Sequence, residues 1–132
     1  MVLADGNGLP TSVLIDSASP HESQLIEPLL AVRQLRSLPK HLLYDQAADG
    51  DALRIRLKRR GIELITPHRK NRVKPPLQDR RRLRRYRRRY KIERSISWLQ
   101  NFRRLVTRYE YHADLFLGFV QLACFKILLK RF

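Results

Sequence analysis

The sequence predicts an α/β fold in the order strand, strand, helix, strand, helix, strand, helix, helix. Two observations predict it. Short apolar runs alternate with segments of helical periodicity along the 132 residues. The connection from Ile15 through a first helix to Leu42 is long enough for a crossover between parallel strands. The length predicts one domain or a piece of one.

The first elements are a predicted hairpin and a helix. Two apolar runs, at residues 2–4 and 13–15, flank Asp5-Gly6-Asn7-Gly8, and Asn-Gly favours a hairpin turn. Ser19-Pro20-His21-Glu22 then predicts a capping box, with the serine as N-cap. The helix is expected to end before Pro39. Its predicted inner face consists of Leu25, Ile26, Leu29, Leu30, Val32 and Leu35.

The middle of the chain predicts a strand, a helix and a second strand. Residues 41–45 form a short apolar run that ends in Asp45. Asp49-Gly50-Asp51 predicts the start of a helix over residues 52–60, with Leu53 and Leu57 facing inward. Gly61 suits the position just after that helix, and residues 62–65 are expected to form a strand.

The last third predicts a loop and two helices. Residues 66–78 hold three prolines and are expected to form a mobile loop. A long helix is predicted from Arg80 toward Val106, and a last one over residues 112–130. The predicted apolar row of the long helix is Ile92, Ile96, Leu99, Phe102 and Val106.

The charge of the chain indicates a polyanionic partner. The formal net charge is +16, and the sequence pI is about 11.2. Residues 69–94 hold 14 of the 28 Lys and Arg residues, against the acids Asp79 and Glu93. DNA, RNA and an anionic membrane surface are the candidate partners. The excess of arginine favours nucleic acid, because a guanidinium pairs with phosphate through two hydrogen bonds.

Composition also excludes several classes of site. A single cysteine, Cys124, excludes an internal disulfide and a cysteine-cluster zinc site, and it is expected to be a buried apolar residue. The four histidines form no metal-ligand pattern. The first residues lack the features of a signal peptide. The apolar run over residues 115–129 is shorter than the ~20 residues of a membrane span. A core helix and a cytoplasmic protein are expected.

Two carboxylates are the candidate catalytic groups. Glu93 shares a predicted helix face with Tyr86 and Tyr90, at spacings of i, i+4 and i+7 within the basic stretch. Asp45 ends a predicted strand, where sites of open α/β sheets lie. Two carboxylates in a basic chain suggest a two-metal site for phosphodiester chemistry. The structural alternatives are a turn-capping Asp and a Glu paired with a neighbouring arginine.

Longer stretches of the chain resemble a known family. The segment from Arg85 to Arg94 contains Tyr86, Arg89 and Glu93, and it resembles the catalytic-glutamate signature of insertion-sequence DDE transposases. Residues 42–54, around Asp45, resemble the segment that holds the second catalytic aspartate. Residues 60–72 are similar to the strand and basic loop that follow. Gln46-Ala47-Ala48 and Gln100 depart from the family pattern.

The resemblance implies an RNase H-like catalytic domain that cuts and joins transposon ends with two Mg²⁺ or Mn²⁺ ions. Asp45 and Glu93 would be catalytic and metal-binding residues, in a mixed sheet of about four strands with flanking helices. The implied partner is double-stranded DNA, and the implied location is the cytoplasm, in association with the nucleoid. The implied DNA-binding residues are Arg69, Lys70, Arg72, Arg84, Arg85, Tyr86, Arg88 and Arg89.

The resemblance also implies a part of a larger enzyme. The first aspartate of the family and its N-terminal DNA-binding region have no counterpart in residues 1–132. We therefore expect the C-terminal part of a catalytic domain, inactive alone, with the remaining transposase part or another subunit as partner. The alternatives are a non-catalytic basic protein that coats DNA or RNA, and an inert transposase relic.

Overall fold

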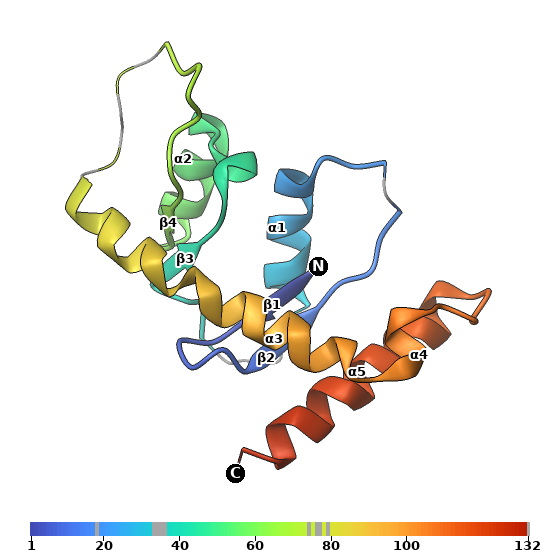
Figure 1. Ribbon diagram of the computed structural model, residues 1–132. Coiled ribbons are helices and arrows are strands. Elements are labelled where there is room, and N and C mark those ends of the chain that lie inside the picture. The colour runs from blue at the N-terminus through green and yellow to red at the C-terminus, as the bar shows by residue number, and fades with distance from the viewer. Residues whose placement is uncertain (18, 33–36, 74, 76–77, 79, 132) are drawn as a thin grey trace. The chain divides into compact units, whose positions relative to one another are not determined.

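The structure is a computed structural model that describes residues 1–17, 19–32, 37–73, 75, 78 and 80–131 (Figure 1). The chain divides into two units. The first comprises Met1–Leu35 and Tyr90–Phe132, and the second comprises Arg36–Arg89. Both helices and short strands are present, so the predicted α/β class is confirmed. The predicted sheet differs, because the four described strands form two separate two-stranded sheets.

The first unit begins with the predicted hairpin. Strands β1 (Val2–Ala4) and β2 (Pro10–Val13) pair antiparallel, with Val2 opposite Val13. The second strand starts earlier than predicted, because the turn closes at Leu9. Its carbonyl accepts a hydrogen bond of 2.9 Å from the Asp5 amide. The Asp5 carboxylate also accepts bonds from the amides of Asn7 and Leu9, each 2.8 Å long. The carboxylate therefore organises the turn.

Helix α1 (Glu22–Ala31) starts later than predicted, and the predicted Ser19 cap is wrong. His21 is the N-cap, and its Nδ1 accepts a hydrogen bond of 3.2 Å from the Ser23 amide. An imidazole nitrogen satisfies a free amide of the first turn as a serine hydroxyl would. Ile26, Leu29 and Leu30 are buried as predicted, Val32 is exposed, and Leu35 lies outside the described residues.

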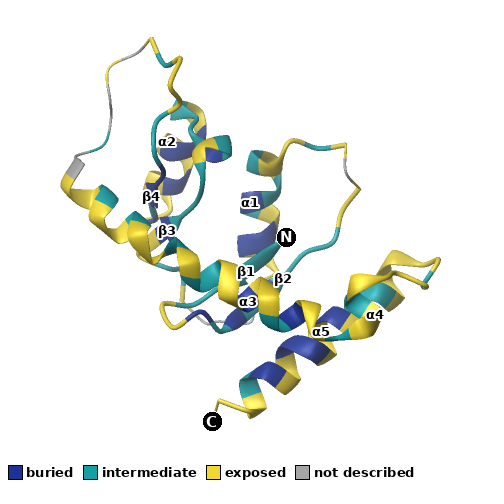
Figure 2. Ribbon diagram, viewed as in Figure 1, coloured by how far each residue is buried: buried dark blue, intermediate teal, exposed yellow. Residues whose placement is uncertain are grey.

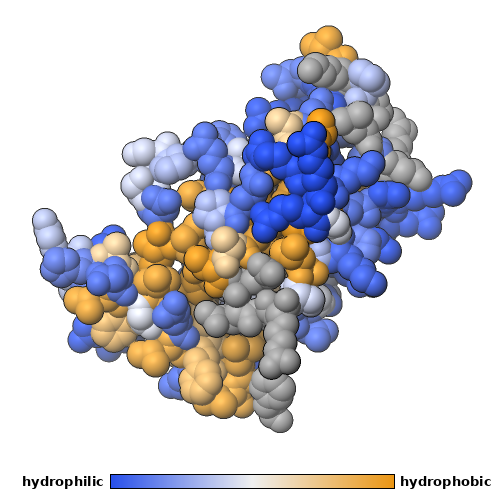
Figure 3. All heavy atoms as spheres, turned by 180° about the vertical axis from the view of Figure 1, so that it is seen from behind, coloured by the Kyte–Doolittle hydropathy of each residue, from blue (hydrophilic) through white to orange (hydrophobic). Residues whose placement is uncertain are grey.

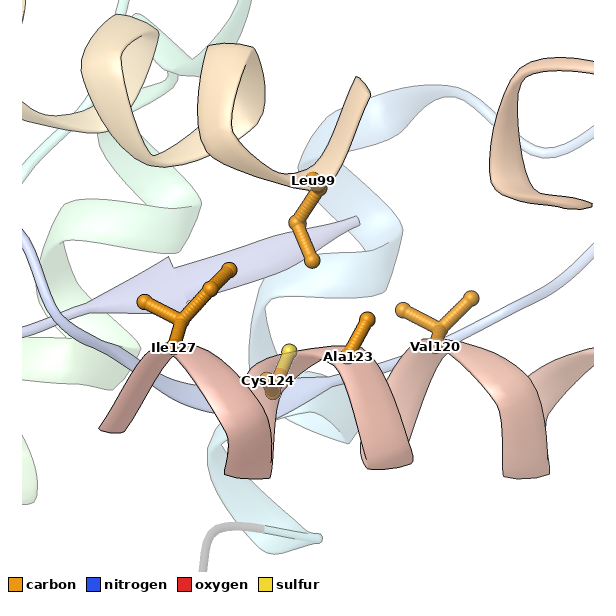
Figure 4. Packing of buried hydrophobic residues seen from close by; sticks show 5 residues of the cluster. All are labelled: Leu99, Val120, Ala123, Cys124 and Ile127. Carbon is orange, nitrogen blue, oxygen red and sulfur yellow. The ribbon is translucent and has the colours of Figure 1, made fainter. Parts of the chain in front are cut away.

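The helices α3 (Tyr90–Gln100), α4 (Arg103–Val106) and α5 (Ala113–Leu129) complete the first unit. Its core joins α3 to α5 and contains Leu99, Val120, Ala123, Cys124 and Ile127 (Figure 4). Cys124 is buried as predicted, and burial raises the pKa of its thiol to about 11. Trp98, Phe102 and Val13 pack against this core. Among the described residues, no helix has the length and apolarity needed to cross a membrane.

The single long helix predicted from Arg80 to Val106 is wrong. The chain forms a 3-10 helix, η2 (Arg80–Arg89), and then α3 and α4. Helix α3 ends because the Asn101 and Phe102 amides bond to carbonyls three residues earlier. The predicted apolar row is also altered, since Ser95 is buried whereas Ile96 and Val106 are exposed. Ser95 takes the inward position because its hydroxyl lies against the hairpin turn.

The second unit is a βαβ arrangement. Strands β3 (His41–Leu43) and β4 (Glu63–Ile65) pair in parallel, with Leu42 opposite Leu64, and α2 (Asp51–Arg59) connects them. A short 3-10 helix, η1 (Gln46–Ala48), lies between β3 and α2. Leu53 and Leu57 are buried as predicted, and Figure 2 shows buried positions along α2. Gly61 follows α2 with φ +76°, as its predicted position requires.

Gly8 joins the hairpin turn to α3. Its φ is +81°, and a Cβ there would lie 2.9 Å from the Lys91 carbonyl oxygen and 3.2 Å from an Arg94 nitrogen. The Ser95 hydroxyl lies within hydrogen-bond reach of the Gly8 carbonyl, and Arg94 donates a bond of 2.6 Å to the Asn7 carbonyl. The turn thus rests directly on the first turns of α3.

We expect Gly8→Ala to lower the free energy of unfolding of the first unit by about 1–3 kcal/mol, because left-handed strain and a backbone clash add. Thermal unfolding monitored by circular dichroism measures the change. Gly6→Ala is the matched control, since a Cβ at Gly6 meets no atom within 4 Å. Equal melting temperatures for the two variants would contradict the close packing of the turn on α3.

Candidate functional site

The basic helix η2 has one inner row and an outer arginine surface. Three residues per turn place every third side chain on the same line. Leu83, Tyr86 and Arg89 form the half-buried row. The residues between them are exposed arginines: Arg81, Arg82, Arg84, Arg85, Arg87 and Arg88. A 3-10 helix therefore half-buries one row of side chains and leaves the arginines between them exposed to water.

The outer arginines differ in their contacts. Arg82 pairs with Glu63, and Arg85 contacts His41 Nε2. Desolvation and the charges of Arg85, Arg82 and Lys40 lower the pKa of His41, so the imidazole tends to stay neutral. Arg84, Arg87 and Arg88 have no hydrogen-bond or ion-pair partner among the described residues. These three guanidiniums, which we call the free arginine set, are available for an external anion. Of the three, the sequence-based prediction omitted Arg87.

Asp45 lies just after β3, as predicted, and caps η1. Its Oδ1 accepts a hydrogen bond of 2.9 Å from the Ala47 amide. Its Oδ2 lies 3.7 Å from Arg89 Nη2, and Arg89 Nη1 donates a bond of 3.2 Å to the Tyr86 hydroxyl. The side chain keeps 35% of its surface exposed. One carboxylate oxygen thus bonds to the turn, the other lies near Arg89, and part of the side chain stays exposed.

The family resemblance implied that Tyr86 and Arg89 contact DNA. In the structure they form a chain of contacts with Asp45, inside the second unit. The spacing that placed Tyr86 on one face with Tyr90 and Glu93 assumed a continuous α-helix. The helix changes type at Tyr90, so that alignment does not apply.

Glu93 lies in the first turns of α3, in the other unit, with an exposed side chain. Its neighbours Lys91 and Arg94 both donate to carbonyls of the hairpin turn, at Gly6 and Asn7. Their cationic groups are therefore engaged away from Glu93. No described residue forms a hydrogen bond or ion pair with the Glu93 carboxylate. The structural alternative, a Glu93 paired with a neighbouring arginine, is therefore absent among the described residues, and the carboxylate stays open to an external cation.

An ion-pair cluster around Asp49 anchors the basic loop. The Asp49 side chain is 1% exposed, and its Oδ1 lies 3.0 Å from both Arg54 Nη2 and His68 Nδ1. Its Oδ2 accepts a bond of 2.9 Å from the Arg69 amide, and Arg72 Nη1 lies 3.5 Å from Oδ1. The sequence predicted Asp49 only as a helix-start residue. No local pattern marks these contacts, because the partners lie on separate segments.

The cluster also determines which basic loop residues are free. Burial raises the pKa of Asp49, but the hydrogen bonds from the Arg69 amide, Arg54 and His68 outweigh it and lower the pKa. Arg72 pairs with Asp51 at 2.8 Å, and Arg69 donates to the carbonyls of Gln46 and Ala47. These two arginines hold the described part of the predicted loop. Lys70 remains exposed.

Within each of the two units, the described residues contain no three-residue metal cluster. No group of at least three His, Cys, Asp or Glu side chains suited to a metal ion occurs there. Asp45 and Glu93 belong to different units. What each offers separately is an exposed carboxylate oxygen, the donor type that Mg²⁺ and Mn²⁺ accept.

Comparison with known proteins adds a family assignment. The model of the family described as "Transposase DDE domain" matches residues 1–125. A curated Burkholderia cepacia protein, named "Putative transposase for insertion sequence element IS402", is 30% identical over 131 residues, covering 93% of this chain. The chain spans 58% of the length of that relative. No solved structure matches.

Proposed function

Because the chain belongs to the transposase DDE-domain family of insertion sequences, we propose that it forms part of a transposase that binds transposon ends and cleaves and transfers DNA strands. We further propose that its α/β elements belong to an RNase H-like catalytic core. The proposed partners are double-stranded DNA and the remaining part of the transposase or another subunit. The proposed location is the cytoplasm, in association with the nucleoid.

The free arginine set carries the DNA-binding part of the proposal. Arg84, Arg87 and Arg88 are exposed, and no described residue neutralises them. Six exposed arginines on ten residues repel one another unless a polyanion is present. Guanidiniums bind phosphate oxygens in any base sequence, so we propose contacts to the backbone rather than to the bases. We propose that Lys70 and Arg85 extend this surface. Arg69 and Arg72 hold the basic loop in place, and Tyr86 and Arg89 anchor η2 to Asp45.

Asp45 and Glu93 are the proposed metal ligands. Each presents a carboxylate oxygen to solvent, and oxygen donors fit Mg²⁺ or Mn²⁺. Two such ions, when bound, would activate the attacking oxygen and stabilise the leaving oxygen of a phosphodiester. The protein's own contribution is to hold the carboxylates. The Ala47 amide orients Asp45, and the contacts of Lys91, Arg94 and Ser95 with the hairpin turn fix the part of α3 that carries Glu93.

The DNA-binding proposal is tested by the salt dependence of affinity. Each neutralised phosphate contributes about −0.9 to the slope of log K against log salt. Replacing Arg84, Arg87 and Arg88 together by alanine should therefore make the slope shallower by about 2.7, and weaken binding about tenfold to a hundredfold near 50 mM salt. Fluorescence anisotropy with several unrelated duplexes measures both, and all duplexes should weaken about equally.

The matched control removes the same charge from another element. Lys58, Arg59 and Arg60 are exposed at the end of α2, and their replacement by alanine also lowers the net charge by three. If this control weakens binding as much as the η2 variant, the general charge of the protein, and not the free arginine set, accounts for affinity. If the slope is unchanged in both variants, the free arginine set does not bind DNA phosphates.

A second candidate function is nucleic-acid binding without catalysis. It is favoured by the exposed arginines of η2, because guanidiniums bind phosphate without needing a catalytic group. This alternative predicts the same salt slope but no dependence of any DNA cleavage on Asp45 or Glu93. The two candidates therefore separate in a cleavage assay, whereas the binding assay alone does not distinguish them.

A further inference from the structure

The loop between α4 and α5 presents two exposed tyrosine rings. It comprises residues 107–112, which we call the tyrosine loop, and it projects from the helices that it joins (Figure 1). Tyr109 and Tyr111 are 75% and 91% exposed, whereas the side chain of Glu110 between them is 8% exposed. Side chains alternate in this way along extended backbone, so the two rings lie on the same side of the loop.

Charged side chains hold the tyrosine loop to both flanking helices. Arg104 of α4 donates a hydrogen bond of 3.2 Å from Nη1 to Glu110 Oε1. Arg108 donates a bond of 2.8 Å from Nε to the Glu110 carbonyl and one of 3.0 Å from Nη2 to the Tyr111 carbonyl. The Arg108 guanidinium also lies 5.4 Å from the ring centroid of Phe116 on α5. A loop braced in this way binds a ligand without first losing the entropy of a free loop.

A hollow beside the rings contains an arginine that is available for an anion. It measures about 840 Å³, and it is lined by Gln100, Arg103, Arg104, Val106, Thr107 and Tyr109. The Arg103 guanidinium has no hydrogen-bond or ion-pair partner among the described residues. Residues 103–112 hold three arginines against one acid, so their surroundings attract an anion. Figure 3 shows hydrophilic side chains beside hydrophobic ones at the end of this unit that carries α4 and α5.

We propose that the tyrosine loop binds an unpaired strand of nucleic acid. Bases stack on Tyr109 and Tyr111, and a phosphate of the strand pairs with Arg103. Every base has a face that stacks on an aromatic ring, so the site accepts any sequence. A proline-rich peptide also packs on exposed tyrosines, but it brings no anion for the arginine. This inference rests on the proposed DNA-binding function and deepens it, because η2 is proposed to contact the duplex backbone and belongs to the other unit.

The spacing of the two rings favours unpaired bases over a duplex. Residues two positions apart in extended backbone are separated by roughly 6–7 Å. Successive bases in one strand of a duplex are separated by only about 3.4 Å along the axis, and each is covered by its neighbours. Two rings at the wider spacing therefore stack on successive bases only when those bases have separated from one another, as in an unpaired strand.

The central test compares single-stranded and double-stranded DNA on the full chain. Tyr109→Ala and Tyr111→Ala should each lower the affinity for an oligothymidylate of about twelve nucleotides by about fivefold to a hundredfold, and leave duplex affinity nearly unchanged. Phenylalanine at either position keeps the ring and should keep the affinity. Phe125→Ala is the matched control, because Phe125 is a 58% exposed aromatic residue on α5, outside the loop. Fluorescence anisotropy measures all these affinities.

Two further measurements locate the strand. Arg103→Ala should make the slope of log K against log salt shallower by about 0.7 for the single strand, because one phosphate contact is lost. Photochemical cross-linking of an oligonucleotide that carries 5-iodouracil should attach it to Tyr109 or Tyr111, as identified by mass spectrometry of the peptides. The cross-link needs no variant, so it tests the site even if a substituted chain folds poorly.

Three results would each overturn the proposal: equal loss of single-strand affinity in the Phe125 control, cross-links only outside the tyrosine loop, or tyrosine variants that weaken a proline-rich peptide but not oligothymidylate. The proposed DNA-binding function fails separately. If duplex affinity depends on the free arginine set while the tyrosine variants bind oligothymidylate normally, only the tyrosine-loop proposal is wrong. A chain that binds neither form of DNA would overturn both.

Discussion

Replacing Glu93 by glutamine is expected to lower metal-dependent DNA cleavage at least about a thousandfold, because a metal that stabilises transition-state charge contributes several kcal/mol. The chain spans 58% of the Burkholderia relative. The assay therefore uses a chimera in which this chain replaces the matching part of that relative. Its substrate is DNA with the ends of insertion sequence element IS402, in Mg²⁺ or Mn²⁺, and the product is a nicked strand resolved on a denaturing gel.

Asp45→Asn tests the second carboxylate in the same chimera. Asparagine keeps a side-chain oxygen for the Ala47 amide, so the η1 cap is retained while the charge is lost. We expect a loss of cleavage similar to that of Glu93→Gln, with DNA affinity nearly unchanged. Mn²⁺ binding, measured by the loss of its free electron-spin signal, should weaken in both variants.

The control for both carboxylates is Asp16→Asn, an exposed acid whose side chain bonds only to the Ser17 amide among the described residues. If cleavage survives Asp45→Asn, Asp45 is not a ligand of the catalytic metal ions. Cleavage that survives both carboxylate variants would leave DNA binding as the function of this chain. Loss in the Asp16 control would indicate that any loss of negative charge inactivates the chimera.

Replacing Asp49 by asparagine is expected to lower the free energy of unfolding of the second unit by about 3 kcal/mol or more. Removing one partner of a buried pair leaves the other charge uncompensated in a poorly solvated place. That partner is Arg54, which is 9% exposed and also donates to the Leu64 and Thr66 carbonyls. Because domains are stable by only ~5–15 kcal/mol, the loss is a large fraction of the total.

Urea unfolding monitored by circular dichroism measures this loss. Glu93→Gln is the control, since its exposed carboxylate has no ion-pair partner among the described residues and its removal should leave stability within about 0.5 kcal/mol. The same midpoint for Asp49→Asn and the unmodified chain would show that the cluster contributes no net stability.

Acid should remove the contribution of Asp49. Its pKa is lowered in the folded chain, so the folded state binds its proton less readily than the unfolded state. The contribution is fully present above the unfolded pKa of about 3.9 and is lost as the pH falls through the lower, folded value. Stability should therefore drop below about pH 4, and Asp49→Asn should flatten that drop. An identical acid limb in the variant would contradict the assignment.

Local patterns in the sequence predicted most elements correctly. The Asn-Gly turn, the helix with Leu53 and Leu57 inward, and the Gly61 terminus are all present. These features depend on residues within a few positions of one another, which propensity and spacing capture. The failures were at Ser19, along the Arg80–Val106 segment and in the predicted mixed sheet, which is two separate two-stranded sheets. Competing caps and tertiary contacts decided these outcomes. Three residues per turn suited the Leu83, Tyr86 and Arg89 row better than a continuous α-helix.

The sequence by itself determined the family, the strongly basic character and the candidate acids Asp45 and Glu93, because each is a matter of residue type at a given position. Only the tertiary structure decided which cations are available: Arg72 is held by Asp49 and Asp51, whereas Arg84, Arg87 and Arg88 have no partner among the described residues. It also decided that α5 buries one face and exposes another. The reason is that pairing and burial depend on segments distant in sequence, whose approach no local spacing encodes.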